Sequence, residues 1–500
     1  MALLGIDVGT THCKAGLFTM DGAAITISSR KTPTHYTPKG HAYFDPEELW
    51  QTVAGVIQTV TAASSHSVAA IGIASMAETG LLLDRNKGNP RSNMIPWFDT
   101  AAQPQATRLA DSIDLLDLYL IAGLRVNYKC SLAKILWLRD HDPDSLQDAI
   151  WLSAADTVAF RLTQAFGTDY SLAGRTCAFN IGQKRWDEHW LGKWDITTDL
   201  FPTPRPSGTP VGKTTADWQH LGLPPGIPVA ISGHDHVCGA VAAGAVTPGL
   251  IFDSMGTAEG LVGAFPERPL TEADFRAGLS IGCHAASGKH YWMGGLSTSG
   301  GAIEWLRSLL NTTPLTYEEI LGLLETTDNQ PTGLLFFPYL LGSASPHSDP
   351  MVRGAFVGLR NDHTRADLVK AVLEGTAYEI EVVRRAGEKM AGQPMEAFIV
   401  AGGGTRNPFW LQIKADVSGC KIQVSSEPET TLLGAAVLAG IGAGLYANQA
   451  EALTAIAGST RTTVYPDEKR HQTYRTLFES GYLRLQEPLR DFAKIDLQNS

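Results

Sequence analysis

The sequence has few cysteines and no closely spaced pair of them. Its six cysteines are scattered over 500 residues, and no two of them form a C-x-x-C motif. In so long a chain this scatter is typical of reduced thiols, so we expect a cytoplasmic protein without disulfides. An excess of positive charge is also missing, because 40 Lys and Arg stand against 51 Asp and Glu, for a net charge of −11. This balance excludes the electrostatic footprint of a nucleic-acid or anionic-membrane binder.

Long apolar runs are absent too. No stretch reaches 18 apolar residues without charge or proline, and the first residues have no basic segment ahead of a long apolar run. We therefore expect neither a transmembrane helix nor a signal peptide. Hydrophobic residues make up 44% of the chain and charged residues only 18%, which suits large cores. The length is typical of two to four domains.

Two common nucleotide-binding motifs are missing. No G-x-G-x-x-G occurs at residues 401–407 or 440–445, so a dinucleotide fingerprint is excluded. The "GKTT" at 212–215 lacks the glycine of a Walker A loop, because Ser207 stands in its place. It also lies in a proline-rich connector over 201–228.

What is present is an alternation of strand and helix patterns, which predicts α/β domains with largely covered sheets. The expected strands are 2–8, 14–18, 69–75, 95–100, 227–235 and 397–404, and the expected helices are 46–63, 131–140, 153–163, 237–246, 300–310, 317–326 and 364–391. The tail from Asp467 to Asp496 is charged and helical, and we assign it no chemistry.

A weak internal repeat divides the chain. Asp7-Val8-Gly9-Thr10 parallels Asp253-Ser254-Met255-Gly256-Thr257, and Thr10 and Thr257 are 247 positions apart. Each stretch is a strand that ends in Gly-Thr and then resumes, which predicts two α/β halves unless the similarity arose by chance. Such a turn is either an ordinary hairpin or a phosphate cradle, made of backbone amides and Thr hydroxyls with Lys14 nearby. Two cradles facing each other would clamp a nucleotide.

The stretch "GHDHVCG" at 233–239 invites two opposed interpretations. Zinc needs three or four converging ligands, whereas His234 and His236 share one face of an extended segment with Asp235 opposite, and no partner motif exists. We favour a single working carboxylate, because Asp235 follows a buried strand and can accept a proton from a substrate hydroxyl. A helix N-cap remains the alternative. His234, His236 and Cys238 are then mainly local packing, with His236 a candidate substrate contact.

Three further patterns are weaker. Glu78 follows a strand and could bind polyol hydroxyls or be an ordinary solvated loop residue. Trp97 and Asp99 pair a ring with a carboxylate, which suits carbohydrate. The "AGGGTRN" at 401–407 permits close passage of a flat ring or a phosphate, or is a flexible turn.

Together these stretches resemble the FGGY family of carbohydrate kinases, which includes glycerol, xylulose, ribulose and gluconate kinases. The resemblance runs along the whole chain in order, through "GIDVGTTHCKAGLF", "SMAETGLLLD", "WFD", "TDYSLAGRT", "GHDHVCGA", "DSMGTAEG", "GGLSTSGGAIEWL" and "VAGGGTRNPFWLQIKADVSG". It implies two actin-like (ribonuclease H-like) ATPase domains around a central cleft. We expect a sugar-binding, catalytic N-terminal domain at 1–246 and a nucleotide-binding C-terminal domain at 247–500.

The resemblance also implies roles for single residues. Asp235 corresponds to the catalytic base, and Asp7, with Asp235, to the carboxylates that organise magnesium (Mg2+). The nucleotide side, which would bind ATP, comprises Thr10, Thr11, Lys14, Gly256, Thr257, Gly300, Glu304, Gly403, Gly404 and Asn407. The substrate side comprises Ala77, Glu78, Trp97, Asp99, Asp235 and His236.

Departures from the family pattern leave the sugar open. Glycerol kinases carry an Arg before the Glu and xylulose kinases a Met-His pair, but the tripeptide here is Met76-Ala77-Glu78. The arginine common after Trp-x-Asp is replaced by Thr100-Ala101-Ala102. We therefore expect ATP-dependent phosphorylation of a ketopentose, polyol or sugar acid. Homodimers are common in this family, but the sequence leaves the oligomeric state open. The alternative is an actin-like regulatory or scaffold ATPase without sugar kinase activity.

Overall fold

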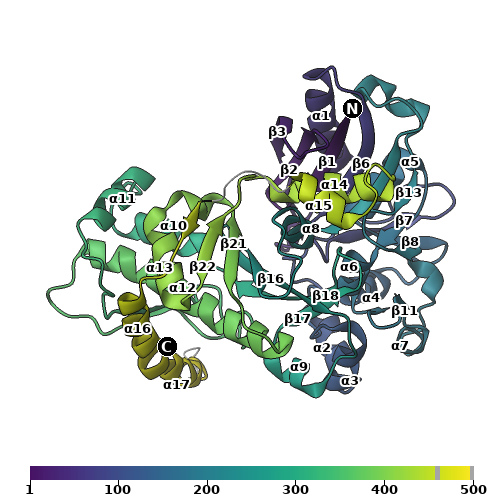
Figure 1. Cartoon of the computed structure of the whole chain (residues 1–500). Helices are drawn as coiled ribbons and strands as arrows, with labels where there is room; N and C mark the ends of the chain where they lie inside the picture. Colours follow the sequence, from purple (N-terminus) through teal and green to yellow (C-terminus); the bar gives the residue numbers. More distant parts are fainter. Residues whose placement is uncertain (457–461, 496–500) are drawn as a thin grey trace.

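The computed structural model describes residues 1–456 and 462–495, and it contains two α/β units, each built on a mixed sheet (Figure 1). The first sheet has the strand order β13 (Pro210–Lys213), β14 (Pro228–His234), β6 (Val68–Ser75), β1 (Ala2–Val8), β2 (His12–Phe18) and β3 (Ala24–Lys31). The second has the order β17 (Ser280–Cys283), β18 (Lys289–Leu296), β16 (Glu259–Pro266), β15 (Leu250–Met255), β21 (Ala397–Ala401), β22 (Lys421–Val424) and β23 (Thr463–Val464).

The two sheets share one pairing scheme. In the first, β1, β2 and β3 pair in an antiparallel series, while β6 and β14 continue from β1 in parallel. In the second, β15, β16 and β18 form the antiparallel series, and β21 and β22 the parallel one. Asp7 and Asp253 therefore lie near the carboxyl ends of equivalent strands, which confirms the predicted repeat at the level of topology.

The main helices begin and end where local chemistry predicts. Those that the first unit contributes are α1 (Pro46–Ala62), α2 (Gln103–Asp111), α3 (Leu115–Ala122), α4 (Ser131–His141), α5 (Ala154–Thr163) and α8 (Asp235–Ala242). Those of the second are α9 (Glu272–Ala277), α10 (Gly300–Leu309), α11 (Tyr317–Glu325), α12 (Arg365–Ala391), α13 (Pro408–Ser418), α16 (Glu468–Leu477) and α17 (Leu483–Ala493). The side chain of Asp45 caps α1, and α12 starts with a Thr364/Asp367 capping box and ends at the left-handed Gly392.

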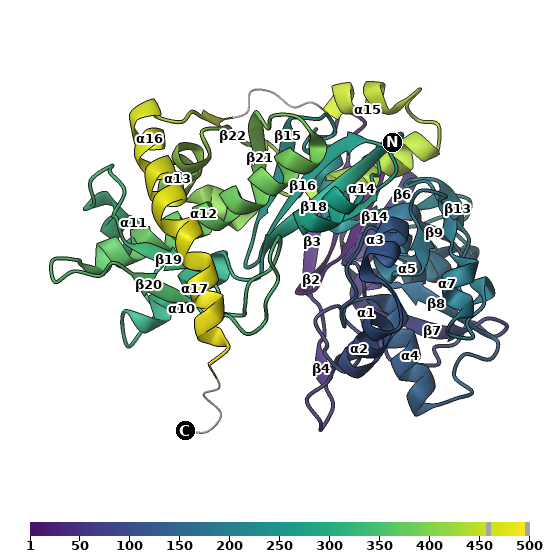
Figure 2. The ribbon, with the colours of Figure 1, turned by 90° about the horizontal axis from the view of Figure 1, so that it is seen from below.

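One helix from the second half of the sequence belongs in space to the first sheet. After β22 the chain returns as α14 (Thr430–Gly442), which packs on β1 and β6, and as α15 (Gln449–Ile456), which packs against α14 and α8 (Figures 1 and 2). Glycines allow this close approach: a Cβ on Gly5 would come 2.1 Å from the carbonyl oxygen of Leu432, and one on Gly72 1.9 Å from that of Ala435. A division of the chain at 246/247 therefore does not follow the packing.

Three predicted elements differ from the structure. The strand predicted over 397–404 ends at Ala401, because Gly402 has a positive φ and residues 403–406 form a 3₁₀ turn. Residues 95–100 form a turn and no strand, because Pro96 has no N–H for a ladder and Asp99 accepts the amide of Ala101. The helix predicted over 237–246 begins two residues earlier, at Asp235, and ends at Ala242. None of the helices within residues 1–456 and 462–495 is long and apolar enough to cross a membrane.

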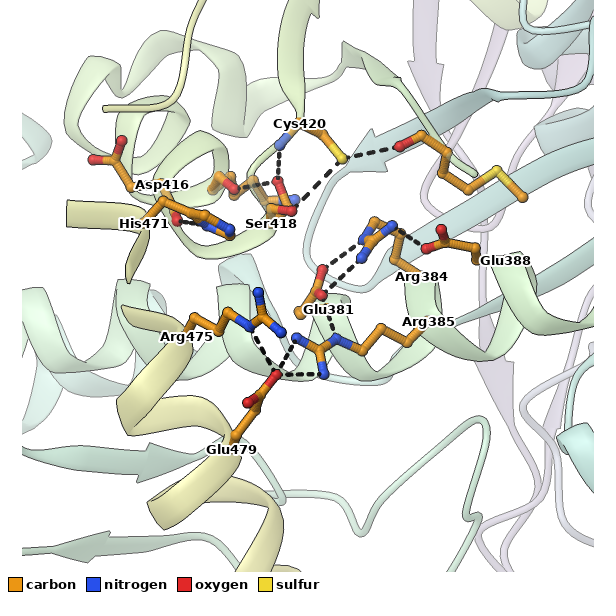
Figure 3. Close-up of polar contacts among 12 residues, drawn as sticks. Glu381, Arg384, Arg385, Glu388, Asp416, Ser418, Cys420, His471, Arg475 and Glu479 are labelled. Atoms are coloured by element: carbon orange, nitrogen blue, oxygen red, sulfur yellow. Dashed lines mark hydrogen bonds and ion pairs between the residues drawn. The ribbon is translucent and has the colours of Figure 1, made fainter. Parts of the chain in front are cut away.

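An ion network fastens the charged C-terminal tail to the second unit (Figure 3). The buried carboxylate of Glu381 on α12 accepts from Arg384 and Arg385, each at 2.6 Å. Arg385 also reaches Glu479, which in turn pairs with Arg475 of α16 at 3.0 Å. The tail predicted without chemistry therefore has a packing role, since every charge of this network has a partner within it.

Candidate active site

Asp235 lies where β14 turns into α8, at the place where the two units meet (Figure 1). One carboxylate oxygen, Oδ1, accepts the amide of His236 at 2.7 Å and lies 2.8 Å from Nδ1 of His234. The other oxygen makes no hydrogen bond to the described residues, and 24% of the side chain is exposed. The N-cap of α8 is His234 and not Asp235, which removes the N-cap alternative for the aspartate.

The charge of Asp235 is set by its two histidine neighbours. Burial favours the neutral acid, but His236 and His234 favour the carboxylate more strongly and lower its pKa to about 2. The group is therefore ionised at neutral pH, with one oxygen held and one free. The sequence assigned His234 to packing; the hydrogen bond to Asp235 corrects this, and only the strand-to-helix turn brings the two side chains together.

We expect His234→Gln to move the acid limb of the pH–rate profile to higher pH. A group that lowers the pKa of Asp235 is removed, so its pKa rises toward the ordinary range and the base is lost at a higher pH than in the wild type. The measurement is kcat/KM against pH for both proteins. An acid limb at the same pH in both would contradict this role of His234.

Asp7 lies next to Asp235 at the end of β1. Its Oδ1 is buried and has no hydrogen-bond partner. Burial raises its pKa well above the usual value, and the negative charge of Asp235 raises it further, against the opposing effect of Lys14. An orphaned carboxylate oxygen beside a second carboxylate fits a hard cation such as Mg2+, which keeps several waters and takes the rest of its ligands from phosphates.

A zinc site does not form at 234–238. Among the described residues, no group of three or more His, Cys, Asp or Glu side chains is arranged to hold a metal. Cys238 is fully buried, and Nδ1 of His234 is taken by Asp235. The chemistry of this segment therefore depends on the aspartate.

The first Gly-Thr turn connects the two sides of the site. Thr10 accepts a hydrogen bond from the indole Nε1 of Trp97 at 2.8 Å, so its hydroxyl lies toward the predicted substrate side. Thr11 is exposed, and Lys14 pairs at 2.7 Å with Glu429, which directly precedes α14. A phosphate bound at this turn would have to share Lys14 with that carboxylate.

The second turn is held against the start of α10. The amide of Gly300 donates to the carbonyl of Gly256 at 3.1 Å, and that of Gly301 to Thr257 at 3.0 Å. Gly403 and Gly404 form a 3₁₀ turn after β21, where a Cβ on Gly404 would come 2.9 Å from Cβ of Met255. These predicted nucleotide-side positions therefore do come together at the carboxyl ends of β15 and β21.

Two of the predicted nucleotide-side residues have side chains that bind other residues of the protein. The side chain of Asn407 caps α13 by accepting the amide of Trp410 at 3.1 Å. Glu304 is exposed on α10 and pairs with Arg307 at 2.8 Å. Both lie on elements next to the glycine turns, but Asn407 caps its own helix, and Glu304 binds Arg307 and also accepts from the hydroxyl of Tyr317 on α11.

The predicted substrate side is built around Glu78. This residue has a positive φ of 54°, and Arg175 donates to its Oε1 through Nε at 2.8 Å and through Nη2. Arg175 was missed in the sequence, although it lies in the "TDYSLAGRT" stretch, because nothing local shows that it faces Glu78. The Trp97 ring is half-buried beside this pair, and Ala77 is buried.

Asp99 and His236 differ in what their side chains contact. Both carboxylate oxygens of Asp99 are occupied by backbone amides, those of Ala42 at 2.7 Å and Ala101 at 2.9 Å, so it holds the turn around Trp97. The His236 ring reaches the second unit, where a Cβ on Gly260 of β16 would lie 2.9 Å from its Cε1. The residues beside the base thus contact both units.

Comparison with known proteins decides the family. Residues 2–242 match the N-terminal domain of the FGGY family of carbohydrate kinases, and residues 254–443 match its C-terminal domain. A glycerol kinase from Gloeobacter violaceus is 30% identical over 91% of this chain and 90% of its own. The chain belongs to the FGGY family of carbohydrate kinases.

Other proteins similar to this FGGY kinase are named for different substrates. A xylulose kinase from Bacillus subtilis is 28% identical over 95% of both chains. The crystal structure of a gluconate kinase from Lactobacillus acidophilus superposes with a TM-score of 0.90, at 22% identity, over 100% of this chain and 99% of that one. The fold class expected from the sequence, two actin-like ATPase domains, is therefore confirmed.

Proposed function

We propose that this FGGY kinase transfers the γ-phosphoryl group of ATP to a hydroxyl of a small sugar, polyol or sugar acid, with Asp235 as the general base. The observation that carries the proposal is the ionised carboxylate of Asp235, which has one oxygen held by His234 and His236 and one oxygen free. A free oxygen can accept the hydroxyl proton as the new P–O bond forms.

The remaining groups supply position and charge. Asp7 would hold Mg2+, which when bound neutralises the phosphate oxygens, so that the free oxygen of Asp235 stays available for the hydroxyl. The amides of the two Gly-Thr turns and Lys14 would bind the phosphates from opposite units. Phosphoryl transfer depends mainly on such positioning and on electrostatic stabilisation, so this set of residues is sufficient for the proposed reaction.

The test is ADP release with Mg2+-ATP against a panel of polyols, ketoses and sugar acids. We expect at least one panel member to raise the rate by ~100-fold or more over the hydrolysis of ATP alone, because the base acts only on a bound hydroxyl. Basal ATP hydrolysis that no panel member stimulates would favour the actin-like regulatory or scaffold ATPase instead.

A further inference from the structure

Lys129 brings an ammonium group without a carboxylate partner to the substrate side of the site. It lies in the loop between α3 and α4, and its Nζ is 5.0 Å from the centre of the Trp97 ring. The side chain is half-buried, and within the described residues Nζ forms no hydrogen bond or ion pair. A cation over an indole is attracted by the ring but keeps its hydrogen-bond donors free for another group.

The neighbouring segment fixes Lys129 in place. Lys134, one turn into α4, is fully buried and donates to the carbonyl oxygen of Pro96 at 2.9 Å and to that of Glu78. These two bonds tie the start of α4 to both chain segments that form the substrate side. The position of Lys129 therefore follows from a rigid contact and not from a free loop.

Arg175 contributes a second unused donor. Its Nε and Nη2 are directed at Glu78, whereas Nη1 is buried and makes no hydrogen bond within the described residues, although the buried hydroxyl of Tyr291 acts on the guanidinium. A buried guanidinium nitrogen without an acceptor is unfavourable unless a ligand supplies one. The carboxylate of Glu78 is thus bound by Arg175 and lies within the electrostatic reach of Lys129, and no hydrogen bond within the described residues uses its Oε2 atom.

We propose that Lys129 and Arg175 bind a carboxylate of the substrate, so that the acceptor of the phosphoryl group is a sugar acid. A carboxylate offers the planar acceptor pair that an arginine and a lysine recognise, and as a monoanion it balances the excess positive charge beside Glu78. The substrate would then lie with its carboxylate at Lys129, a hydroxyl on Glu78 and the reacting hydroxyl at Asp235. This inference rests on the proposed function and narrows its substrate class.

The experiment compares aldonates with alditols of equal chain length: erythronate with erythritol, xylonate with xylitol and gluconate with glucitol. For the wild type we expect kcat/KM of the best aldonate to exceed that of its alditol by ~10-fold or more, because the unpaired donors reject a substrate that lacks the acceptor. We expect Lys129→Met to lower this ratio by about 10-fold or more. The matched control is Lys193→Met, since Lys193 also lies over a tryptophan ring, that of Trp190 at 5.9 Å, but outside the site.

Two outcomes would overturn the inference: a wild type that prefers alditols, or an aldonate/alditol ratio that Lys129→Met leaves unchanged. If Lys129→Met does not fold, Lys129→Gln replaces it, with the melting temperature as the check. Titration calorimetry of xylonate and gluconate with Asp235→Asn separates this inference from the proposed function. If the aldonates bind in a way that depends on Lys129 but the wild type phosphorylates no substrate, the carboxylate site is supported and the proposed kinase activity is contradicted. If the wild type phosphorylates only neutral sugars, the kinase activity is supported and the carboxylate site is contradicted.

Discussion

Asp235→Asn lowers kcat by ~10²- to 10⁴-fold, the usual contribution of general base catalysis. Asparagine keeps the shape of the side chain and can still accept the amide of His236, but it cannot take a proton from the substrate hydroxyl. The KM for ATP should change only a few-fold, because the proposed mechanism binds the phosphates mainly at the two turns. The measurement is steady-state kinetics with the best substrate of the panel.

The matched control for this variant is Asp114→Asn. Asp114 also stands at the start of a helix, where its side chain accepts the amide of Leu116, but its helix α3 packs against α9 and β10 (Phe179–Asn180). We expect the control to keep wild-type kcat. If Asp235→Asn also kept kcat within a few-fold, Asp235 could not be the base, and the mechanism proposed for this kinase would be wrong.

Lys414→Met destabilises the second unit by about 3–5 kcal/mol, which is typical of removing one partner from a buried ion pair. Lys414 on α13 is buried, and its ammonium binds the carboxylates of Asp253 and Glu259, which are fully buried in the second sheet. Burial and the neighbouring Glu259 already raise the pKa of Asp253 to about 8, so without the lysine this buried acidic pair is left with no cation. We expect a melting temperature lower by on the order of 10 °C, measured by calorimetry.

Two variants check this interpretation. Lys421→Met removes an exposed lysine from the neighbouring β22 and should leave the melting temperature unchanged. Adding Asp253→Asn and Glu259→Gln to Lys414→Met removes the acidic groups of the cluster as well. This triple variant should recover part of the lost stability, because replacing a whole buried ion cluster by neutral groups costs less than removing one of its members. A single Lys414→Met protein as stable as the wild type would show that the cluster does not hold the sheet.

The fold could be predicted from the sequence because its signals are local and repeated. The strand that ends at Val8 and the strand that ends at Met255 have the same Asp and Gly-Thr pattern, and the structure gives them equivalent places in two sheets. The turn at 95–100 was predicted wrongly, since an apolar run with aromatics is typical of a strand. The Asp99 side chain that closes the turn has no distinctive local pattern.

The site could be predicted only where one segment carries the chemistry. Asp235 and Asp7 each end a strand, so their placement follows from the rule that working residues gather at such ends. The partners of these residues come from distant segments: Arg175 meets Glu78 across 97 positions, and Lys14 meets Glu429 across 415. No periodicity encodes such contacts, because they depend on how α4, α8 and α14 pack.

The return of α14 to the first sheet brings the described crossings of the chain between the two sheets next to the elements that hold Asp235. The described chain passes between the two sheets over residues 243–249 and 425–429, and the first of these segments contains Gly244 and Gly249, both with positive φ. The second ends at Glu429, the partner of Lys14, two residues before Thr431 donates to the carbonyl of Asp235 at 3.2 Å. Both crossings therefore adjoin the elements that hold Asp235, so this aspartate belongs to the first sheet while the second Gly-Thr turn belongs to the second sheet.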